Sequence, residues 1–250
     1  MDLGLRRKSA VVTGASKGIG RAIALRLAEE GANIAICARG EAALGQTEQD
    51  LRGFGVKVFA KMCDVGDPEA LDDFLDGARQ ALGRIDILVN NASALAFSDD
   101  EAGWHGNFNV DVMAAVRATH KVVPWMAEDG GAIVHISSNS GLDAGSPAPY
   151  AAAKAALISY SKTSAIALAP QRIRVNVVAP GSIEFPGGLW EGIKQTNREL
   201  YDMVRAMIPW GRMGTAEEVA DVVTFLASPR ANWITGACLT VDGGQHKANL

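Results

Sequence analysis

Residues 9–28 read SAVVTGASKGIGRAIALRLA, and this stretch decides the fold. Ser9–Thr13 is a short, mostly apolar run typical of a buried strand, and the residues after Gly20 carry a helical pattern. Three glycines, at positions 14, 18 and 20, form the turn between them. A strand, a glycine-rich turn and a helix in this order are the context in which a dinucleotide pyrophosphate binds at a helix N-terminus. The stretch therefore predicts a nucleotide-binding βαβ unit.

Each glycine of this turn has its own expected role. Gly14 permits the sharp bend, Gly18 lets the backbone approach a pyrophosphate, and Gly20 lets the helix pack on the strand. The alternative phosphate loop, Gly-x4-Gly-Lys-Ser/Thr, is absent because Ile19 follows Gly18 where that loop needs a lysine. Glycine turns between a strand and a helix also occur without a ligand, so a second observation is needed.

That second observation is a pair of polar residues in the other half of the chain. Tyr150 and Lys154 are four residues apart in an alanine-rich run, with Ser138 twelve residues upstream. Positions i and i+4 of a helix share one face, with Cβ atoms about 5–6 Å apart. An ammonium held this close lowers the pKa of a tyrosine from its usual value of about 10, and such a tyrosine exchanges protons with an alcohol or alkoxide. Helices carry such pairs by chance, so the pair becomes informative only together with the glycine turn.

Together these segments resemble the classical short-chain dehydrogenase/reductase family. The resemblance extends from about Leu5 to Gln245, in the family's order and usual spacing. Its motifs are Thr13-Gly14-x3-Gly18-Ile19-Gly20, Asn90-Asn91-Ala92, Ser138, Tyr150-x3-Lys154 and Asn176-Val177-Val178-Ala179-Pro180-Gly181. The resemblance implies hydride transfer between a nicotinamide and a carbonyl or carbinol carbon. The motifs specify the family and leave the substrate open.

The same resemblance implies roles for individual residues. Ser138 would donate a hydrogen bond to the substrate oxygen, Tyr150 would protonate it during reduction, and Lys154 would acidify Tyr150 and hold the nicotinamide ribose. Asn90 would lie beside the cofactor and brace the sheet, whereas Asp64 matches an aspartate that contacts the adenine in the family, although it is explained equally well as a strand-end or helix-start residue. The residues expected to contact the cofactor are Gly14, Ser16, Lys17, Gly18, Ile19, Gly20, Arg39, Asp64, Val65, Asn91, Ala92, Tyr150, Lys154, Pro180, Gly181 and Ile183.

Three positions depart from the family pattern. Asp111 occupies the place of an asparagine that orders a water next to the lysine. An aspartate accepts the same hydrogen bonds and adds a negative charge, which favours charged Lys154, and we count Asp111 among the catalytic residues. Phe185 stands where a threonine often touches the cofactor, and Ser93 replaces a common glycine.

The choice of cofactor is argued from charge. The second predicted strand ends in Ala35-Ile36-Cys37-Ala38-Arg39. Enzymes that prefer NAD usually place an acidic residue at this strand end, bonded to the ribose hydroxyls. Here Arg39 follows an alanine, and Lys17 lies within the glycine turn. Two cations without a carboxylate suit a 2′-phosphate, so we expect NADP(H) rather than NAD(H); the alternative is that both are solvated surface charges.

Bulk properties restrict the class of protein. The chain has 250 residues, a formal net charge of −4 and 48% hydrophobic residues, which fits one domain over 1–250. The charge gives no basic footprint for nucleic acid, and no apolar run approaches the roughly 20 residues of a membrane span. The four histidines lack metal-ligand spacing, so no metal is expected. Cys37, Cys63 and Cys238 lie in apolar runs and predict buried free thiols in a reducing cytoplasm.

Alternating apolar and helical runs predict an α/β fold with a single Rossmann-type, doubly wound parallel sheet of about seven strands, flanked by helices on both faces. Strands are expected at Ala10–Thr13, Asn33–Ala38, Lys57–Ala60, Ile85–Asn90, Ala132–Ser137, Arg174–Val178 and Cys238–Val241. Helices are expected at Gly18–Glu30, Glu41–Phe54, Pro68–Leu82, about Trp104–Glu128, Tyr150–Ala169 and Ala216–Ala227. The strand ends should converge on one crevice.

The substrate is the least defined part of the prediction. An aromatic-rich and methionine-rich segment at about residues 182–210 suits a mobile substrate lid, although core or oligomer packing explains the same residues. Family members that act on carrier-protein thioesters present basic residues near the end of the fourth helix, where this chain has Glu128-Asp129. Like charges repel, so we expect a ketone or 3-oxoacyl-type reductase acting on a free carbonyl, an alcohol or a coenzyme A ester.

Assembly and the competing interpretations complete the prediction. The helix from Tyr150 has few charges, and the family commonly forms tetramers through such helices, so a homotetramer or homodimer is expected. The alternatives are an NAD(H)-dependent alcohol dehydrogenase and a catalytically silent NADPH-binding regulator; the latter would be expected to lack Tyr150 or Lys154. A hydrolase using His135 and Ser138 is disfavoured because no Gly-x-Ser-x-Gly motif surrounds the serine.

Overall fold

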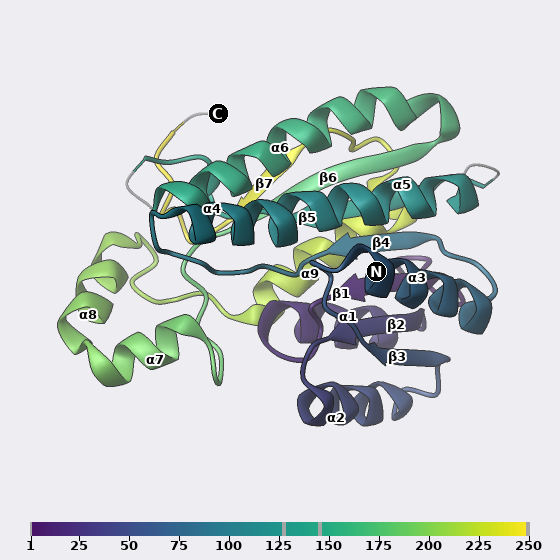
Figure 1. Cartoon of the computed structure of the whole chain (residues 1–250), viewed down its shortest axis with the longest axis horizontal. Helices are drawn as coiled ribbons and strands as arrows, with labels where there is room; N and C mark the ends of the chain where they lie inside the picture. Colours follow the sequence, from purple (N-terminus) through teal and green to yellow (C-terminus); the bar gives the residue numbers. More distant parts are fainter. Residues whose placement is uncertain (1, 127–128, 145–146, 249–250) are drawn as a thin grey trace.

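The computed structural model describes residues 2–126, 129–144 and 147–248, and its centre is a parallel sheet (Figure 1). Seven strands follow the order β3-β2-β1-β4-β5-β6-β7, and all neighbouring strands are parallel. The predicted doubly wound sheet is thus confirmed. The strands are β1 (Ser9–Thr13), β2 (Asn33–Ala38), β3 (Val58–Met62), β4 (Ile87–Asn90), β5 (Gly131–Ile136), β6 (Ile173–Pro180) and β7 (Cys238–Val241).

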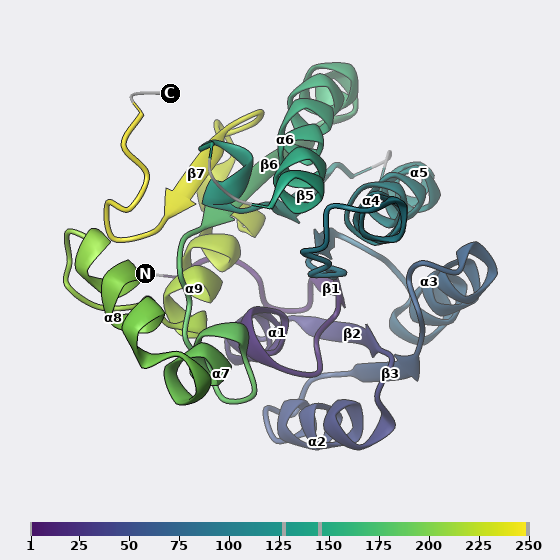
Figure 2. The same cartoon turned by 60° about the vertical axis from the view of Figure 1, so that its left-hand side comes forward.

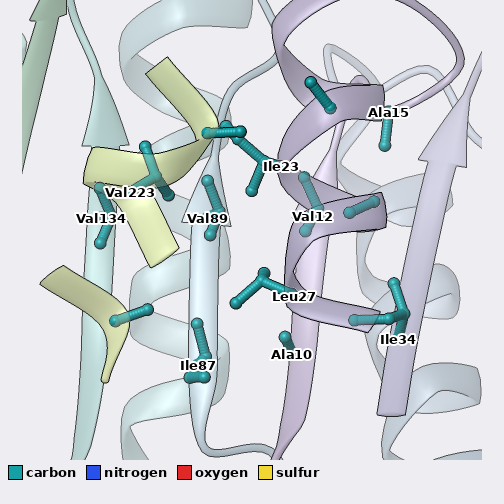
Figure 3. Close-up of a cluster of buried hydrophobic side chains, with 14 of the residues drawn as sticks. Ala10, Val12, Ala15, Ile23, Leu27, Ile34, Ile87, Val89, Val134 and Val223 are labelled. Atoms are coloured by element: carbon teal, nitrogen blue, oxygen red, sulfur yellow. The ribbon is translucent and has the colours of Figure 1, made fainter. Parts of the chain in front are cut away.

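Helices cover both faces of the sheet (Figure 2). Alternate residues of each strand point to opposite faces, so Val12 packs under α1, α2 and α9, whereas its neighbour Val11 packs under α3, α5 and α6. Figure 3 shows Ile23 and Leu27 of α1 among the buried side chains on the face of the sheet that α1 covers. The α-helices are α1 (Gly18–Glu29), α2 (Glu41–Arg52), α3 (Pro68–Leu82), α4 (Glu101–Asn107), α5 (Ala114–Met126), α6 (Ala148–Leu168), α7 (Leu189–Thr196), α8 (Arg198–Met207) and α9 (Ala216–Ala227).

The helix expected at about Trp104–Glu128 differs most from its prediction. The described part consists of α4, a π-helical segment at Phe108–Met113, and α5, and Glu128 lies outside the described residues. The described neighbour of Glu128, Asp129, forms an exposed ion pair with Arg84 at 3.1 Å. A π-helical turn inside an α-helix is rare and is found mostly at functional sites. The turn directs attention to the residue at its centre, Asp111.

The segment expected to be a lid contains two helices that the sequence analysis did not predict. Helices α7 and α8 stand to one side of the sheet in both views (Figures 1 and 2). They have a small core of their own, in which Tyr201 packs with Ile208 and Met213. Tyr201 also donates a hydrogen bond to Glu184, which joins the two helices to the end of β6. None of the described helices is both long and apolar enough to cross a membrane.

One of the three cysteines is not buried, contrary to expectation. Cys37 and Cys63 are buried free thiols, whereas Cys238 is exposed. The reason is topological: Cys238 begins β7, which is the last strand of the sheet, so one side of it has no neighbouring strand among the described residues. An apolar run is therefore not sufficient to predict burial at the edge of a sheet.

The strand order reverses between β1 and β4, and this position sets the site. In open parallel sheets, ligands bind beyond the carboxyl ends of the strands at such a reversal. Gly14 follows β1 and Asn91 follows β4, so the two segments meet there. Ser138 and Gly181 come shortly after β5 and β6, at the same edge.

Candidate active site

The glycine turn is locked against the segment that follows β4. Asn91 Nδ2 donates hydrogen bonds to the Thr13 and Gly14 carbonyl oxygens, at 2.9 and 3.0 Å. Gly14 has a φ of +65°, which glycine adopts without strain. A Cβ atom at Gly20 would overlap both Asn91 Nδ2 and the Gly14 carbonyl. The brace between β1 and β4 is thus made by Asn91, whereas Asn90 faces His135.

The N-terminus of α1 opens toward the crevice without a capping side chain. Lys17 is its N-cap residue and makes no side-chain cap, so the first amides of the helix are left without one. Two contacts join this turn to the segment after β6. The ring of Phe185 packs on Gly18, and Lys17 Nζ donates to the Gly187 carbonyl at 3.1 Å. Position 185, where the family often has a threonine that touches the cofactor, is therefore filled by an aromatic ring.

The ends of β2 and β3 form the outer part of the crevice. Arg39 follows β2 and is exposed, as is Lys17 in the glycine turn. Asp64 follows β3, and its Oδ1 accepts a hydrogen bond from the Gly66 amide at 3.0 Å, while Val65 is buried. The Asp64 carboxylate thus shapes a local turn, which is the alternative that the sequence analysis left open.

The pair at the start of α6 has the expected relative position. Lys154 is buried, and its Nζ lies 5.6 Å from the centroid of the Tyr150 ring. Lys154 Nζ also donates to the Ile136 carbonyl of β5 at 3.0 Å, which fixes the ammonium at the end of that strand. Tyr150 is half-buried, and the ring of Phe97 meets it edge-on with the ring centroids 5.5 Å apart.

Asp111 contacts Lys154 directly. Its Oδ1 lies 2.8 Å from Lys154 Nζ, and its Oδ2 accepts from the Ala94 amide at 2.9 Å. Burial by itself lowers the pKa of Lys154, but the negative charge of Asp111, followed by that of Tyr150, raises it above its ordinary value. The aspartate therefore keeps the lysine charged.

Ser138 lies between β5 and α6 and is buried. Its Oγ accepts from the Ser140 amide at 3.1 Å and lies 3.3 Å from Asn139 Oδ1. Gly141 of the same loop packs on the catalytic helix, because a Cβ there would lie 2.8 Å from both the Lys154 carbonyl carbon and the Ala155 amide. The loop after the serine thus rests on the backbone of the lysine.

The segment after β6 forms the floor of the crevice. Gly181 donates to the Val241 carbonyl at 3.0 Å, so the floor is tied to β7. Ile183 is buried and forms an isolated bridge with Gly214. Gly181 and Ile183 are among the residues that the sequence analysis expects to contact the cofactor.

The surroundings of His135 argue against a role in hydrolysis. It is buried, its Nδ1 lies 3.1 Å from Asn90 Nδ2, and burial together with the charge of Lys154 lowers its pKa to about 3. The ring is therefore neutral and packs near Tyr160, with the ring centroids 5.7 Å apart. In the described part of the chain, no group of three or more His, Cys, Asp or Glu side chains is arranged to hold a metal.

The sequence analysis missed one component of the site. Residues after β7 contact the segments that follow β6 and Ser138: Gln245 bonds to Ser182, and His246 bonds to Asp143. Neither pair belongs to a motif, and their members are 63 and 103 residues apart. No local pattern in the sequence could have indicated them.

The sequence and the fold of this chain resemble those of known reductases and dehydrogenases. Residues 14–246 match a family model described as enoyl-(acyl carrier protein) reductase. The chain is 38% identical over 247 residues to a 3-oxoacyl-(acyl-carrier-protein) reductase of Thermotoga maritima, with 96% of this chain and 98% of the relative covered. L-sorbose reductase of Gluconobacter frateurii, solved with NADPH and L-sorbose, is 36% identical with a TM-score of 0.90, covering 99% and 100% of the two chains. An NAD+-bound xylitol dehydrogenase is 30% identical with a TM-score of 0.90, covering 96% and 99%.

Proposed function

Because the chain belongs to the classical short-chain dehydrogenase/reductase family of oxidoreductases, we propose that it transfers a hydride between NADP(H) and a carbonyl or secondary-alcohol substrate. The observation that carries this proposal is that Lys154 Nζ lies 5.6 Å from the centroid of the Tyr150 ring and bonds to the Ile136 carbonyl, two residues before Ser138.

The residues of the crevice fit a dinucleotide. The uncapped amides at the start of α1 suit a pyrophosphate, and Gly20 can carry no side chain without overlapping Asn91. Lys17 and Arg39 are exposed cations, and Ala38 stands where an acidic ribose ligand would be needed for NAD. This charge pattern supports NADP(H), as does the NADPH that the sorbose reductase binds. The NAD+-bound xylitol dehydrogenase makes NAD(H) the alternative to test.

The chain's own residues hold and move the proton in this proposal. Bound NADPH supplies the hydride for reduction. Tyr150 donates its phenolic proton to the substrate oxygen, and the charged Lys154 stabilises the phenolate that remains. Ser138 Oγ gives up its bond to Asn139 and donates a hydrogen bond to the same oxygen. Asp111 keeps Lys154 protonated through the cycle.

The proposed substrate is a ketone or a 3-oxoacyl thioester, and helices α7 and α8 are its proposed lid. The reductases that this chain resembles act on 3-oxoacyl groups and on L-sorbose, and both substrates contain a carbonyl beside polar groups. The exposed Leu189 and Met203 of the two helices are apolar surface that substrate could cover.

The proposed assembly is a homotetramer or homodimer in a reducing compartment such as the cytoplasm. Ile166 on α6 is 72% exposed and Trp233 beside β7 fully exposed, which is much apolar surface for an isolated chain. The three free thiols support a reducing compartment. Light scattering of the purified protein measures the assembly directly.

Replacement of Tyr150 tests the proposed function. NADPH oxidation is followed with acetoacetyl-coenzyme A, L-sorbose and a set of simple ketones. Tyr150→Phe should lower kcat by about a thousandfold, within the range for lost general acid catalysis, while NADPH binding is retained. Tyr160→Phe on the same helix is the matched control and should keep its activity. Undiminished turnover by Tyr150→Phe rejects the mechanism, and tight NADPH binding without turnover of any carbonyl by the wild type favours a silent regulator.

A further inference from the structure

A short segment after β7, Asp242–His246, joins the segment that follows β6 to the loop that follows Ser138, and we call it the strap. Its course is set by the first of these residues. The Asp242 carboxylate accepts hydrogen bonds from the Gly244 amide at 3.0 Å and from the His246 amide at 2.7 Å. Gly243 and Gly244 have φ values of +62° and +82°, which other residues rarely adopt. The strap is therefore a defined turn.

The strap is bonded to the segment that follows β6. Gln245 Oε1 accepts from the Ser182 amide at 2.9 Å, and Gln245 Nε2 donates to Ser182 Oγ at 3.1 Å. Gly181 touches the strap so closely that a Cβ there would lie 2.6 Å from Asp242 Cβ. Ser182 is buried, so this attachment is shielded from water.

The last residue of the strap, His246, is bonded to the loop that follows Ser138. His246 Nδ1 lies 2.8 Å from Asp143 Oδ1, and the imidazole is only 6% exposed although the carboxylate is 40% exposed. The imidazole is thus packed into the structure and does not reach out from the surface. Asp143 comes five residues after Ser138 and two after Gly141, which rests on Lys154.

We propose that Asp143 and His246 are positioning residues. They hold the loop that carries Ser138, on the substrate side of the active site, against the segment after β6, on its cofactor side. Gly141 packs the loop on α6, and the His246–Asp143 bond ties the following part of the loop to the strap. Without this bond, Asp143 is no longer held by His246. The loop carries the serine that must meet the substrate oxygen opposite Tyr150, so its position sets how well the substrate binds. The inference rests on the proposed carbonyl reduction at this site.

The test compares His246→Phe, Asp143→Ala and the double variant. His246→Phe keeps a ring and removes both nitrogens, and Asp143→Ala changes a half-exposed residue, so the two variants perturb the fold differently. Each should raise KM for the reduced carbonyl about tenfold, as expected for loss of a hydrogen bond to a charged group. We expect kcat and the NADPH Kd to change by less than about threefold, because neither residue touches the reacting atoms or the glycine turn. The double variant should be no worse than the single ones, because both remove the same bond.

His105→Phe is the matched control. His105 also faces a carboxylate, Glu101 at 3.5 Å, but this pair is exposed on α4. Its KM should stay within about twofold of wild type, since exposed pairs contribute little. Unchanged KM in His246→Phe and Asp143→Ala, or effects that multiply in the double variant, would overturn the proposal.

Hydrogen exchange separates this proposal from the proposed function. Amides of residues 137–144 should exchange faster in His246→Phe than in wild type or His105→Phe, and this readout needs no turnover. A wild type that reduces no carbonyl refutes the function, while the exchange data still decide the role of the bond. Exchange equal to that of wild type refutes the positioning role whatever the activity.

Discussion

The Asp111 carboxylate lies 2.8 Å from the Lys154 ammonium, and neither side chain is more than 3% exposed. Two buried charges this close depend on each other, since removing one leaves the other unpaired. The sequence analysis expected Asp111 to favour a charged lysine, and the raised pKa of Lys154 agrees with that expectation. The Asp111–Lys154 pair therefore affects both the protonation of Lys154 and the stability of the fold.

Asp111→Asn should retain activity near neutral pH. As the pH is raised further, the variant should lose activity at a lower pH than the wild type does. Asparagine still accepts hydrogen bonds, but burial then lowers the Lys154 pKa without an opposing charge. In the wild type, the raised pKa stabilises the fold fully below about pH 10.5, and this contribution is lost as pH rises through the folded-state value. We expect the variant to lose about 3 kcal/mol of unfolding free energy.

Profiles of kcat/KM against pH and urea unfolding of both proteins provide the measurement. Asp72→Asn, which removes one carboxylate from the exposed ion pairs of Lys121, is the control and should change stability little. Complete inactivity of a folded Asp111→Asn would show that the carboxylate has a further role.

Gly20→Ala should destabilise the protein and weaken NADPH binding. Its new methyl group would overlap Asn91 Nδ2, which is held by two hydrogen bonds and cannot move freely. Overpacking of this kind costs about 1–3 kcal/mol, which urea unfolding detects. Gly45→Ala is the control: Gly45 lies in α2 with nothing near its Cβ position, so alanine should stabilise the helix by up to about 1 kcal/mol. Equal stabilities of the two variants would contradict the assigned packing.

Arg39→Asp should change the cofactor preference. An aspartate at this strand end repels a 2′-phosphate and can accept hydrogen bonds from ribose hydroxyls. The Kd for NADPH should rise about tenfold to a hundredfold, as expected for lost hydrogen bonds to a charged group, while the Kd for NADH stays equal or falls. Fluorescence titration with both cofactors measures this, and Arg6→Asp, at an exposed position before β1, controls for net charge. A parallel change in both affinities would place the 2′-phosphate elsewhere.

His135 should make the protein less stable in acid. Its folded-state pKa of about 3 is below the ordinary value of 6.5, so the unfolded chain binds the proton more readily. Stability is therefore lost as pH falls from about 6.5 toward 3, at up to about 1.4 kcal/mol per pH unit. His135→Asn should show a shallower dependence over this window in urea unfolding at a series of pH values. Identical slopes would mean that His135 is protonated in the folded protein.

The parts of the fold that could be predicted are those with a local physical cause. β1, β2 and β5 were placed within one residue at each end because buried parallel strands are nearly continuous apolar runs. The glycine turn was found because close packing at Gly20 admits no side chain. Helix α6 was found from its alanine-rich run, and its Tyr150 and Lys154 take the expected relative position.

Helices α7 and α8 are amphipathic, and this local signal was missed because their apolar residues were assigned to a lid. The remaining parts that could not be predicted depend on contacts between distant segments. The direct contact between Asp111 and Lys154 depends on the π-helical turn, for which the sequence has no recognised signal. The bond between His246 and Asp143 joins residues that lie in no motif.

The strand order has a consequence for how the protein is made. β2 and β3 add in turn to one edge of β1, and β4 to β7 then add one by one from its other edge, so each strand meets a partner that already exists. No strand has to be inserted between two others, and the sheet can grow while the ribosome is still at work. The strap follows β7 in the chain and emerges after every strand, so a chain stalled before the strap would hold a finished sheet in which Asp143 still lacks His246.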